Sequence, residues 1–307
     1  MILTVGMSPC VDVTVRLNKF ALGKTNVAGE KIVTYAGKAN NVALGVSRLG
    51  GEAFVTGFMY NENGSLFEKA LDKEGIPFSF IWNPGRVREN YKFIDGKGVL
   101  TEVNEEGREV AGEKLLDLLD FVRVQAAKSE AAVISGGAPK GTPASFYKDL
   151  VTAAKGAKIV AADTYGDRLK AALEAGVDLI KPNLDELSAT LGGEFSARNE
   201  QLAGARALAK AGAKHVLLSL GGEGSILTDG EEAYYAEGVR VAVESTVGAG
   251  DAMLAAATKS LAEGLPLAEV LRRAAAAGTA SVTERSDPSF KKETYDKIYA
   301  LTKVTKL

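Results

Sequence analysis

Short apolar runs alternate with amphipathic stretches over most of this sequence of 307 residues. The runs 131–137 (AAVISGG), 157–164 (AKIVAADT), 177–183 (VDLIKPN) and 213–222 (AKHVLLSLGG) each end in glycine, asparagine, aspartate or threonine. Continuous apolar runs of this length are typical of strands that are buried on both faces of a parallel sheet. Because helical patterns separate them, the sequence predicts an α/β fold, with a doubly wound, mostly parallel sheet and helices on both faces.

Two other stretches alternate apolar and polar residues with a period of two. Residues 11–35 do so in places, and residues 86–103 do so around the hairpin signal DGKG. Sheets with one solvated face have this pattern, so we predict a small antiparallel β flap, or lid, over the main sheet. We see no internal repeat and no long linker, and we expect one domain over residues 1–307 that includes the lid.

Composition and charge exclude several classes of function. Apolar residues make up 46% and charged residues 25% of the chain, and the formal net charge of −2 comes without a basic block. A soluble globular protein is expected, and neither nucleic-acid binding nor membrane binding is indicated. The apolar runs are too short to span a membrane, and the first residues read as a strand rather than a signal peptide.

The chain contains one cysteine, Cys10, and one histidine, His215. A single cysteine forms no intrachain disulfide, which fits a cytoplasmic protein. Zinc sites of the usual Cys/His type are excluded, and we interpret His215, at the entrance of an apolar strand, as structural. Acid–base chemistry in this protein is therefore expected to depend on carboxylates.

The segment ESTVGAGDAML, residues 244–254, places two glycines and an aspartate just before an apolar helical run. Residues 248–251 would lie at the N-terminus of that helix, where free N–H groups and the helix dipole favour an anion. Asp251 at this point is either an ordinary helix cap or a carboxylate base beside an anion hole. The local pattern does not separate these two interpretations.

Several motifs resemble, in order, those of the PfkB (ribokinase-like) sugar kinases. TVGAGDAM resembles the C-terminal signature of that family, and the likeness extends over nearly the whole chain. The branch that phosphorylates sugar phosphates, with 1-phosphofructokinase and tagatose-6-phosphate kinase, is the most similar. The resemblance implies a ribokinase-like fold and ATP-dependent phosphorylation of a sugar. The other segments that carry it are SPCVDVTV, YAGKANNVALGVSRLG, VISGGAPKG, IKPNLDEL and LLSLGGEGSIL.

The resemblance also implies roles for residues on the acceptor side. Asp251 would take the proton of the sugar hydroxyl, beside an anion hole of backbone N–H groups in the segment Gly248, Ala249, Gly250 and Asp251. The sugar hydroxyls would be bound by Asp12, Gly37 and Asn41. A turn aspartate and a helix cap are the structural alternatives for Asp12 and Asn41.

Three cations are candidates for binding a phosphate that the sugar already carries. Lys38 would act as a point charge, and Lys24 and Arg88 would reach the sugar from the lid. Three cations in one pocket would suit a dianionic substrate, whereas a kinase for a neutral sugar would not need them. The alternative for each residue is a solvated surface charge.

The resemblance implies ATP and Mg²⁺ as the further ligands. Glu186 would serve the Mg²⁺ through water, because this ion keeps several waters in most protein sites. The structural alternative for Asn183 and Glu186 is a helix start. The nucleotide would be bound by Asn183, Glu186, Ser219, Gly221 and Gly224.

The sequence departs from the family pattern at several positions on the sugar side. Ser8 and Asn40 replace the usual residues, and alanines stand at positions 36 and 39 next to the Gly-Lys pair. If Ala39 begins a helix that contacts phosphate, its methyl group would lie where the sugar phosphate approaches. Gly137 stands where a serine is common, which removes one hydroxyl. These departures lie on the sugar side, so they do not change the prediction of an ATP-dependent kinase, but they affect the prediction of which sugar it phosphorylates.

The leading hypothesis is a kinase that converts fructose 1-phosphate to fructose 1,6-bisphosphate. The alternatives are tagatose-6-phosphate kinase, a kinase for a neutral sugar or nucleoside, and a sugar-phosphate-binding regulator without catalysis. A nucleotide-binding oxidoreductase would need G-x-G-x-x-G after the first strand, which is absent. The exposed edges and the uncovered face of the lid predict a homodimer formed through the lid.

Overall fold

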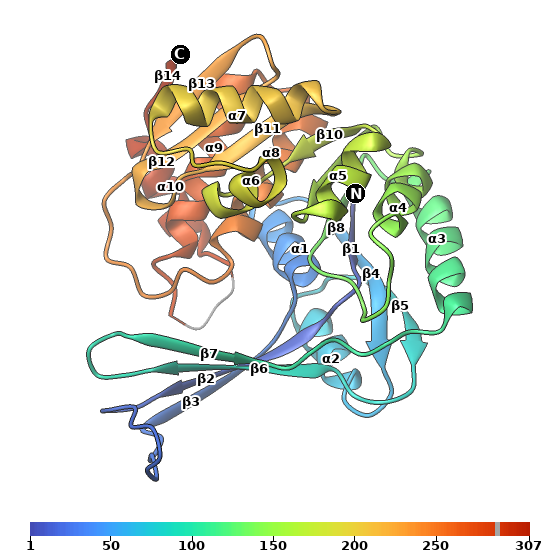
Figure 1. The fold of residues 1–307 in the computed structure, drawn as a ribbon, viewed down its shortest axis with the longest axis vertical. Helices are drawn as coiled ribbons and strands as arrows, with labels where there is room; N and C mark the ends of the chain where they lie inside the picture. Colours follow the sequence, from blue (N-terminus) through green and yellow to red (C-terminus); the bar gives the residue numbers. More distant parts are fainter. Residues whose placement is uncertain (286–288) are drawn as a thin grey trace.

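The computed structural model describes residues 1–285 and 289–307, apart from the side chain of Ala36, and contains two β-sheets of unequal size (Figure 1). The large sheet has ten strands in the order β14-β13-β12-β11-β10-β9-β8-β1-β4-β5. These strands are β1 (Ile2–Gly6), β4 (Ala53–Tyr60), β5 (Phe78–Asn83), β8 (Ala131–Ser135), β9 (Ile159–Asp163), β10 (Val177–Ile180), β11 (Ala213–Ser219), β12 (Gly224–Thr228), β13 (Ala233–Glu237) and β14 (Val304–Lys306).

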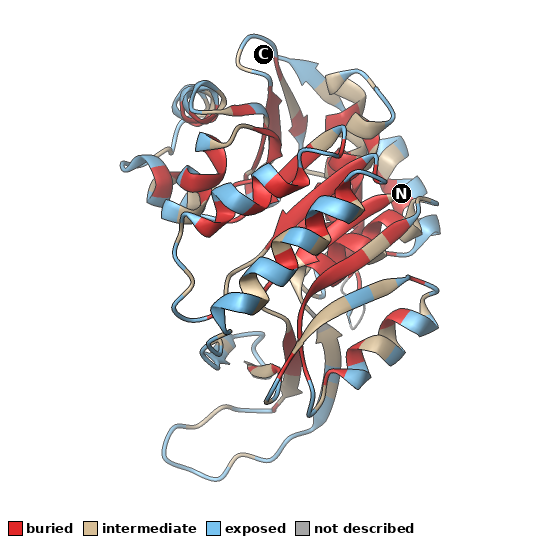
Figure 2. Cartoon of the chain, turned by 90° about the vertical axis from the view of Figure 1, so that its right-hand side faces the viewer, coloured by how far each residue is buried: buried red, intermediate tan, exposed pale blue. Residues whose placement is uncertain are grey.

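The strands from β11 to β5 in this order are parallel, as the continuous apolar runs predict. Successive side chains point to opposite faces, so Leu3 and Val5 enter one apolar core and Ile2 enters the other. Helices cover both cores, and Figure 2 shows buried strands between helices whose outer faces are exposed. The doubly wound α/β fold is confirmed.

Alternating segments of the chain supply helices to the two faces. Residues of α3, α4, α5, α6 and α7 pack in the core that contains Leu3, and residues of α1, α8 and α9 pack in the core that contains Ile2. The helices are α1 (Lys38–Arg48), α2 (Ser65–Lys73), α3 (Gly112–Ala126), α4 (Phe146–Ala154), α5 (Asp167–Glu174), α6 (Leu184–Leu191), α7 (Arg198–Lys210), α8 (Ala249–Ala262), α9 (Leu267–Ser281) and α10 (Lys292–Leu301), with a 3₁₀ turn η1 (Gly221–Glu223).

The small sheet is the predicted lid. Its strands β2 (Cys10–Arg16), β3 (Glu30–Ala36), β6 (Arg88–Ile94) and β7 (Leu100–Asn104) pair in the order β3-β2-β6-β7. The outer pairs are antiparallel, but β2 and β6 run parallel, because β1 and β5 deliver them from the same end of the large sheet. The predicted small antiparallel flap is confirmed, and it contains one parallel pairing, that of β2 with β6.

The lid has one apolar and one polar face, as its period of two predicts. Val11, Val13 and Tyr91 pack against Phe67 of α2, whereas Asp12 and its neighbours on the opposite face line a cavity. The strand signals at the other end of the chain were missed. Strands β12, β13 and β14 extend one edge of the large sheet in antiparallel pairing. Over the described ranges, we find no helix with the length and hydropathy to cross a membrane.

Candidate active site

A cavity of about 450 Å³ lies between the lid and the carboxyl ends of the parallel strands. From β1 the chain builds the sheet in one direction through β4 and β5, and β8 begins the other half on the opposite side of β1. Open α/β sheets bind ligands at such a change of direction, because the loops on either side diverge and leave a crevice. The cavity is lined by residues of both sheets and by the start of α8.

The glycine turn before α8 forms a helix N-terminus that faces this cavity. Gly248 has φ of +83°, which glycine adopts without strain, and no side chain caps the helix. The helix begins at Ala249, and its first bond joins the N–H of Ala252 to the carbonyl of Gly248. The N–H groups of Ala249, Gly250 and Asp251 therefore have no partner within the helix. Gly248, Gly250 and Asp251 line the cavity, and the helix starts earlier than Ala252, where the apolar run begins.

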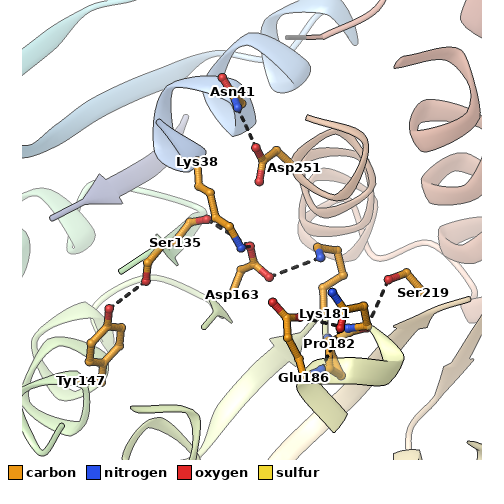
Figure 3. Close-up of polar contacts among 12 residues, drawn as sticks. Lys38, Asn41, Ser135, Tyr147, Asp163, Lys181, Pro182, Glu186, Ser219 and Asp251 are labelled. Carbon is orange, nitrogen blue, oxygen red and sulfur yellow. Dashed lines mark hydrogen bonds and ion pairs between the residues drawn. The ribbon is translucent and has the colours of Figure 1, made fainter. Parts of the chain in front are cut away.

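Asp251 is buried at this helix start and is held by one side chain (Figure 3). Asn41 of α1 donates a hydrogen bond of 2.7 Å from Nδ2 to Oδ2 of Asp251. The Oδ1 atom of Asp251 has no hydrogen bond to any described residue. Burial raises the pKa of Asp251 to about 6, although Lys38 acts in the opposite direction. A buried carboxylate with a free oxygen and this pKa can accept a proton near neutral pH.

We expect the rate of the phosphorylation that the sequence resemblance implies to fall in acid, as Asp251 becomes protonated. Its pKa is raised to about 6, so kcat/KM should be independent of pH above that value and drop about tenfold for each unit below it. Initial rates in overlapping buffers at saturating nucleotide would measure this profile. An acidic limb centred near pH 4, the range of an ordinary carboxyl, would contradict this assignment of the limb to Asp251.

Two lysines share one buried aspartate beside Asp251. Asp163, the last residue of β9, is 1% exposed, and its Oδ2 accepts a hydrogen bond of 2.8 Å from Lys38 Nζ. Its Oδ1 lies 3.3 Å from Nζ of Lys181, which follows β10 (Figure 3). Burial alone would raise the pKa of Asp163, but Lys181 and Lys38 together lower it to about 2. Burial likewise opposes the charge of Lys38, and Asp163 and Asp251 raise its pKa above the ordinary value.

Asp163 and Lys181 were missed in the sequence. Each follows or ends a predicted parallel strand, and that position at the carboxyl edge was the available signal. A Cβ on Gly250 would lie 2.9 Å from Lys181 Nζ. The ammonium group therefore lies directly against the start of α8.

The lid contributes a second polar cluster to the cavity. Asp12 on β2 is 7% exposed, and its Oδ2 lies 2.8 Å from Nζ of Lys92 on β6. Asn90 donates to Asp12 Oδ1 at 3.2 Å, and Arg88 donates to Asn90 Oδ1 at 2.8 Å and to Ser8 Oγ at 3.2 Å. The structure thus brings Asp12 and Arg88 together, as predicted, and adds Asn90 and Lys92.

Cys10 lies in the same cluster and donates from Sγ to Asp12 Oδ1 at 3.6 Å. Burial and then the charge of Asp12 raise the pKa of this thiol to about 12. The thiol is therefore protonated at neutral pH and serves as a weak hydrogen-bond donor. His215 lies on β11, where its Nδ1 is 2.9 Å from the carbonyl oxygen of Asp178, away from this cavity.

The residues predicted to bind nucleotide divide into two groups. Asn183, Glu186 and Ser219 line the cavity. Asn183 and Glu186 form a capping box at the start of α6, with Asn183 Oδ1 accepting from Glu186 N–H at 2.8 Å and Glu186 Oε2 accepting from Asn183 N–H at 3.0 Å. The helix-start alternative is thus present together with the position at the cavity.

Other predicted residues lie elsewhere. Lys24 is exposed in the loop between β2 and β3 and does not line the cavity, and neither do Gly221 and Gly224. A Cβ on Gly224 would lie 2.0 Å from the carbonyl oxygen of Ala236, so this glycine is needed for strand pairing. Lys38 does line the cavity, but its ammonium group is paired with Asp163 on the large sheet and does not join the cations of the lid.

The departures at positions 36, 39 and 137 have different outcomes. The methyl group of Ala39 lies 2.8 Å from where a Cβ on Gly6 would be, so it packs on the end of β1. Ala39 also lines the cavity, so the expectation that its methyl group would lie where the sugar phosphate approaches stays a prediction. Gly137 lines the cavity, and a Cβ there would lie 3.7 Å from Arg168 Nη1. The side chain at position 36 lies outside the described structure.

At one end of the cavity lie the buried carboxylate of Asp251, helix N–H groups without a partner within the helix, and ammonium groups, and at the other end lies the polar face of the lid. N–H groups and ammonium groups stabilise charge that develops on a migrating phosphate, and a carboxylate accepts the proton of an alcohol. The part of the chain that the structure describes contains no group of three or more His, Cys, Asp or Glu side chains placed to bind a metal.

Comparisons with known proteins agree with this chemistry. Residues 6–293 match the family model described as pfkB family carbohydrate kinase. The chain is 34% identical to a 1-phosphofructokinase of Rhodobacter capsulatus over 279 residues, 90% of this chain and 88% of that protein. It is 29% identical to the 1-phosphofructokinase of Bacillus subtilis over 100% of both chains. Phosphofructokinase-2 of Escherichia coli in complex with substrates and products aligns with a TM-score of 0.90 and 28% identity, over 98% of each chain. Another structure of that protein is described as a tetrameric inhibited form.

Proposed function

The chain belongs to the pfkB family of carbohydrate kinases, and on that basis we propose that it phosphorylates fructose 1-phosphate to fructose 1,6-bisphosphate with ATP. The relatives named above are 1-phosphofructokinases, and they match nearly the full length of the chain. The observation that supports this proposal is the buried carboxylate of Asp251 at an uncapped helix start, in a cavity that also holds Arg88 on the lid.

Asp251 is the proposed base. It takes the proton of the acceptor hydroxyl as the oxygen forms its bond to the terminal phosphorus, and the bond from that phosphorus to the bridging oxygen of ADP breaks. The N–H groups of Ala249, Gly250 and Asp251 would stabilise the charge on the moving phosphoryl group. The Oδ1 atom of Asn41 is buried without a hydrogen-bond partner among the described residues, so a sugar hydroxyl would complete its bonding.

The acceptor and the nucleotide would enter from different sides. Asp12, Gly37 and Asn41 bind the sugar hydroxyls in this proposal, and Arg88 binds the phosphate already on the sugar. Asn183, Glu186 and Ser219 lie on the side of α6 and β11 and are assigned to ATP. A role for Lys24 stays a prediction, because its loop lies outside the cavity.

Magnesium is the proposed metal ion, and the residues present fit it. Glu186 borders the cavity and uses only Oε2 in the capping box, with no hydrogen bond to Oε1 from the described residues. Magnesium is commonly held by one or two carboxylates together with waters and nucleotide phosphates, so Glu186 acting through water suffices. Bound there, the ion would neutralise charge on the phosphates of ATP.

A coupled assay of ADP release tests the proposed activity. The wild-type protein is incubated with ATP, Mg²⁺ and, in turn, fructose 1-phosphate, fructose 6-phosphate, tagatose 6-phosphate, fructose and ribose. The highest kcat/KM is expected with fructose 1-phosphate. A higher value with tagatose 6-phosphate would reassign the acceptor, and a higher value with fructose or ribose would contradict a sugar-phosphate kinase.

We also expect a homodimer formed through the lid. Val33 is 40% exposed and Val103 is 56% exposed, and both lie on the lid face opposite to Asp12. A second copy would remove this apolar surface from water. Sedimentation at micromolar concentration should show a dimer, and polar substitutions at both valines should shift it to monomer. A wild-type monomer under these conditions would contradict the expectation.

A further inference from the structure

Lys92 is a buried lysine on the lid that the functional assignment above does not require. It is 8% exposed, lines the cavity and lies on the same lid face as Asp12, Arg88 and Asn90. Lysine is rarely buried unless it is paired, and the pairing partner of Lys92 is Asp12 at 2.8 Å. Burying the two charges of this pair costs free energy, and a role in ligand binding would account for their presence.

The charges on the cavity side of the lid balance only because Lys92 is present. Arg88 and Lys92 are the cations that line the cavity from the lid, and Asp12 and Glu102 are the anions. Glu102 stands directly opposite Lys92 in the pairing of β6 with β7. Without Lys92, two carboxylates would face the entering ligand against one guanidinium, and a dianionic sugar phosphate would be repelled.

Asp12 itself is suited to sugar hydroxyls, which any sugar offers. Its carboxylate is held from both sides, with Oδ1 accepting from Asn90 and Oδ2 paired with Lys92. When a carboxylate binds the hydroxyls of a small sugar phosphate, the carboxylate and the phosphate lie in the same cavity. Their negative charges repel each other unless a cation nearby neutralises the carboxylate.

We propose that Lys92 determines specificity for phosphorylated acceptors by neutralising Asp12 on the lid. This inference rests on the proposed sugar-phosphate kinase activity and adds a residue to it. Lys92 acts through Asp12 and the charge of the lid, so it is a positioning residue rather than a catalytic one. It should therefore act on the choice between a phosphorylated and a neutral acceptor, and not on phosphoryl transfer itself.

The test compares fructose 1-phosphate with fructose as acceptors for the Lys92→Met protein. The kcat/KM for fructose 1-phosphate should fall at least about 30-fold, mainly through KM, because the carboxylate of Asp12, no longer neutralised, would repel the phosphate of the acceptor. The kcat/KM for fructose should change less than about threefold. Lys97→Met, at the exposed tip of the β6–β7 hairpin, removes the same charge from the same sheet and should leave both values unchanged.

A second variant separates charge balance from direct phosphate binding. Asp12→Asn combined with Lys92→Met removes one negative and one positive charge, so the net charge on the cavity side of the lid returns to that of the wild type. The preference for fructose 1-phosphate over fructose should then recover toward the wild-type ratio, even with lower absolute rates. A ratio that stays as low as in Lys92→Met would overturn neutralisation. The double variant also leaves no unpaired buried carboxylate, which keeps the test available if the single variant does not fold.

The remaining outcomes distinguish this inference from the proposed function. Equal losses with both acceptors in Lys92→Met, or a preference unchanged from wild type, would overturn the role of Lys92 alone. A wild-type protein that does not prefer fructose 1-phosphate to fructose would overturn the proposed function and the inference together.

Discussion

The Asp251→Asn protein is expected to phosphorylate fructose 1-phosphate about 100- to 10,000-fold more slowly than the wild type, in kcat. Asparagine keeps the size of the side chain and can still bond to Asn41 in the flipped orientation, but it cannot take a proton. The loss should therefore appear in kcat, while KM for ATP changes little. Steady-state rates with both substrates varied would measure the two effects separately.

Asp117→Asn provides the matched control for this variant. Asp117 lies on the exposed side of α3 and pairs with Lys114 at 3.3 Å, away from the cavity. This control should retain the wild-type rate. An Asp251→Asn protein with undiminished kcat would show that the proton is accepted elsewhere, and the assignment of the base would have to be abandoned.

The second large effect is expected in stability, for Asp163→Asn. The substitution leaves Lys181, which is almost fully buried, and the half-exposed Lys38 without their shared negative partner. Removing one member of a buried charge pair costs about 3 kcal/mol of unfolding free energy. Urea titration at pH 7 would measure it, with Asp167→Asn as control, because the Asp167 side chain is 82% exposed in its pair with Lys170.

The stabilisation by Asp163 should depend on pH and should be lost in acid. The pKa of Asp163 is lowered to about 2 from 3.8, so its contribution is fully present above about pH 4 and is lost as the pH falls through 2. The stabilities of the wild type and the variant should therefore converge in strong acid. Curves that stay parallel down to pH 2 would contradict an ionised Asp163.

The same variant should move the pH profile of catalysis. Burial is the main reason for the raised pKa of Asp251, and the negative charge of Asp163 adds to it. With asparagine at position 163, the acidic limb of kcat/KM should shift to lower pH. An unchanged limb would mean that Asp163 does not influence the pKa of Asp251, the proposed base.

The sequence predicted the elements whose signals are local. The parallel strands were found because their apolar runs are continuous, and the lid because its residues alternate. Strands β12, β13 and β14 were missed, since nothing within a short apolar segment reports whether it pairs parallel or antiparallel. The parallel pairing of β2 with β6 depends likewise on where the large sheet ends, which no local pattern contains.

The site was predictable where one short motif contains both the backbone turn and the side chain, as in residues 248–251. The charge partners were not. Lys38 and Asp163 are separated by 125 residues, and Asp12 and Lys92 by 80. Such pairs arise only when the sheets assemble. A lysine predicted to bind phosphate therefore proved to be paired with an aspartate that no motif had singled out.

The lid shares no strand pairing with the ten-stranded sheet in the residues described. Asp12 and Arg88 on the lid are proposed to bind the sugar phosphate, whereas the helix start, Lys38, Lys181 and the proposed base belong to the large sheet and its helices. Substitutions that alter acceptor choice can therefore accumulate on one layer without disturbing the chemistry on the other. A scaffold divided in this way is free to diverge toward new sugars over evolutionary time while its transfer step stays the same.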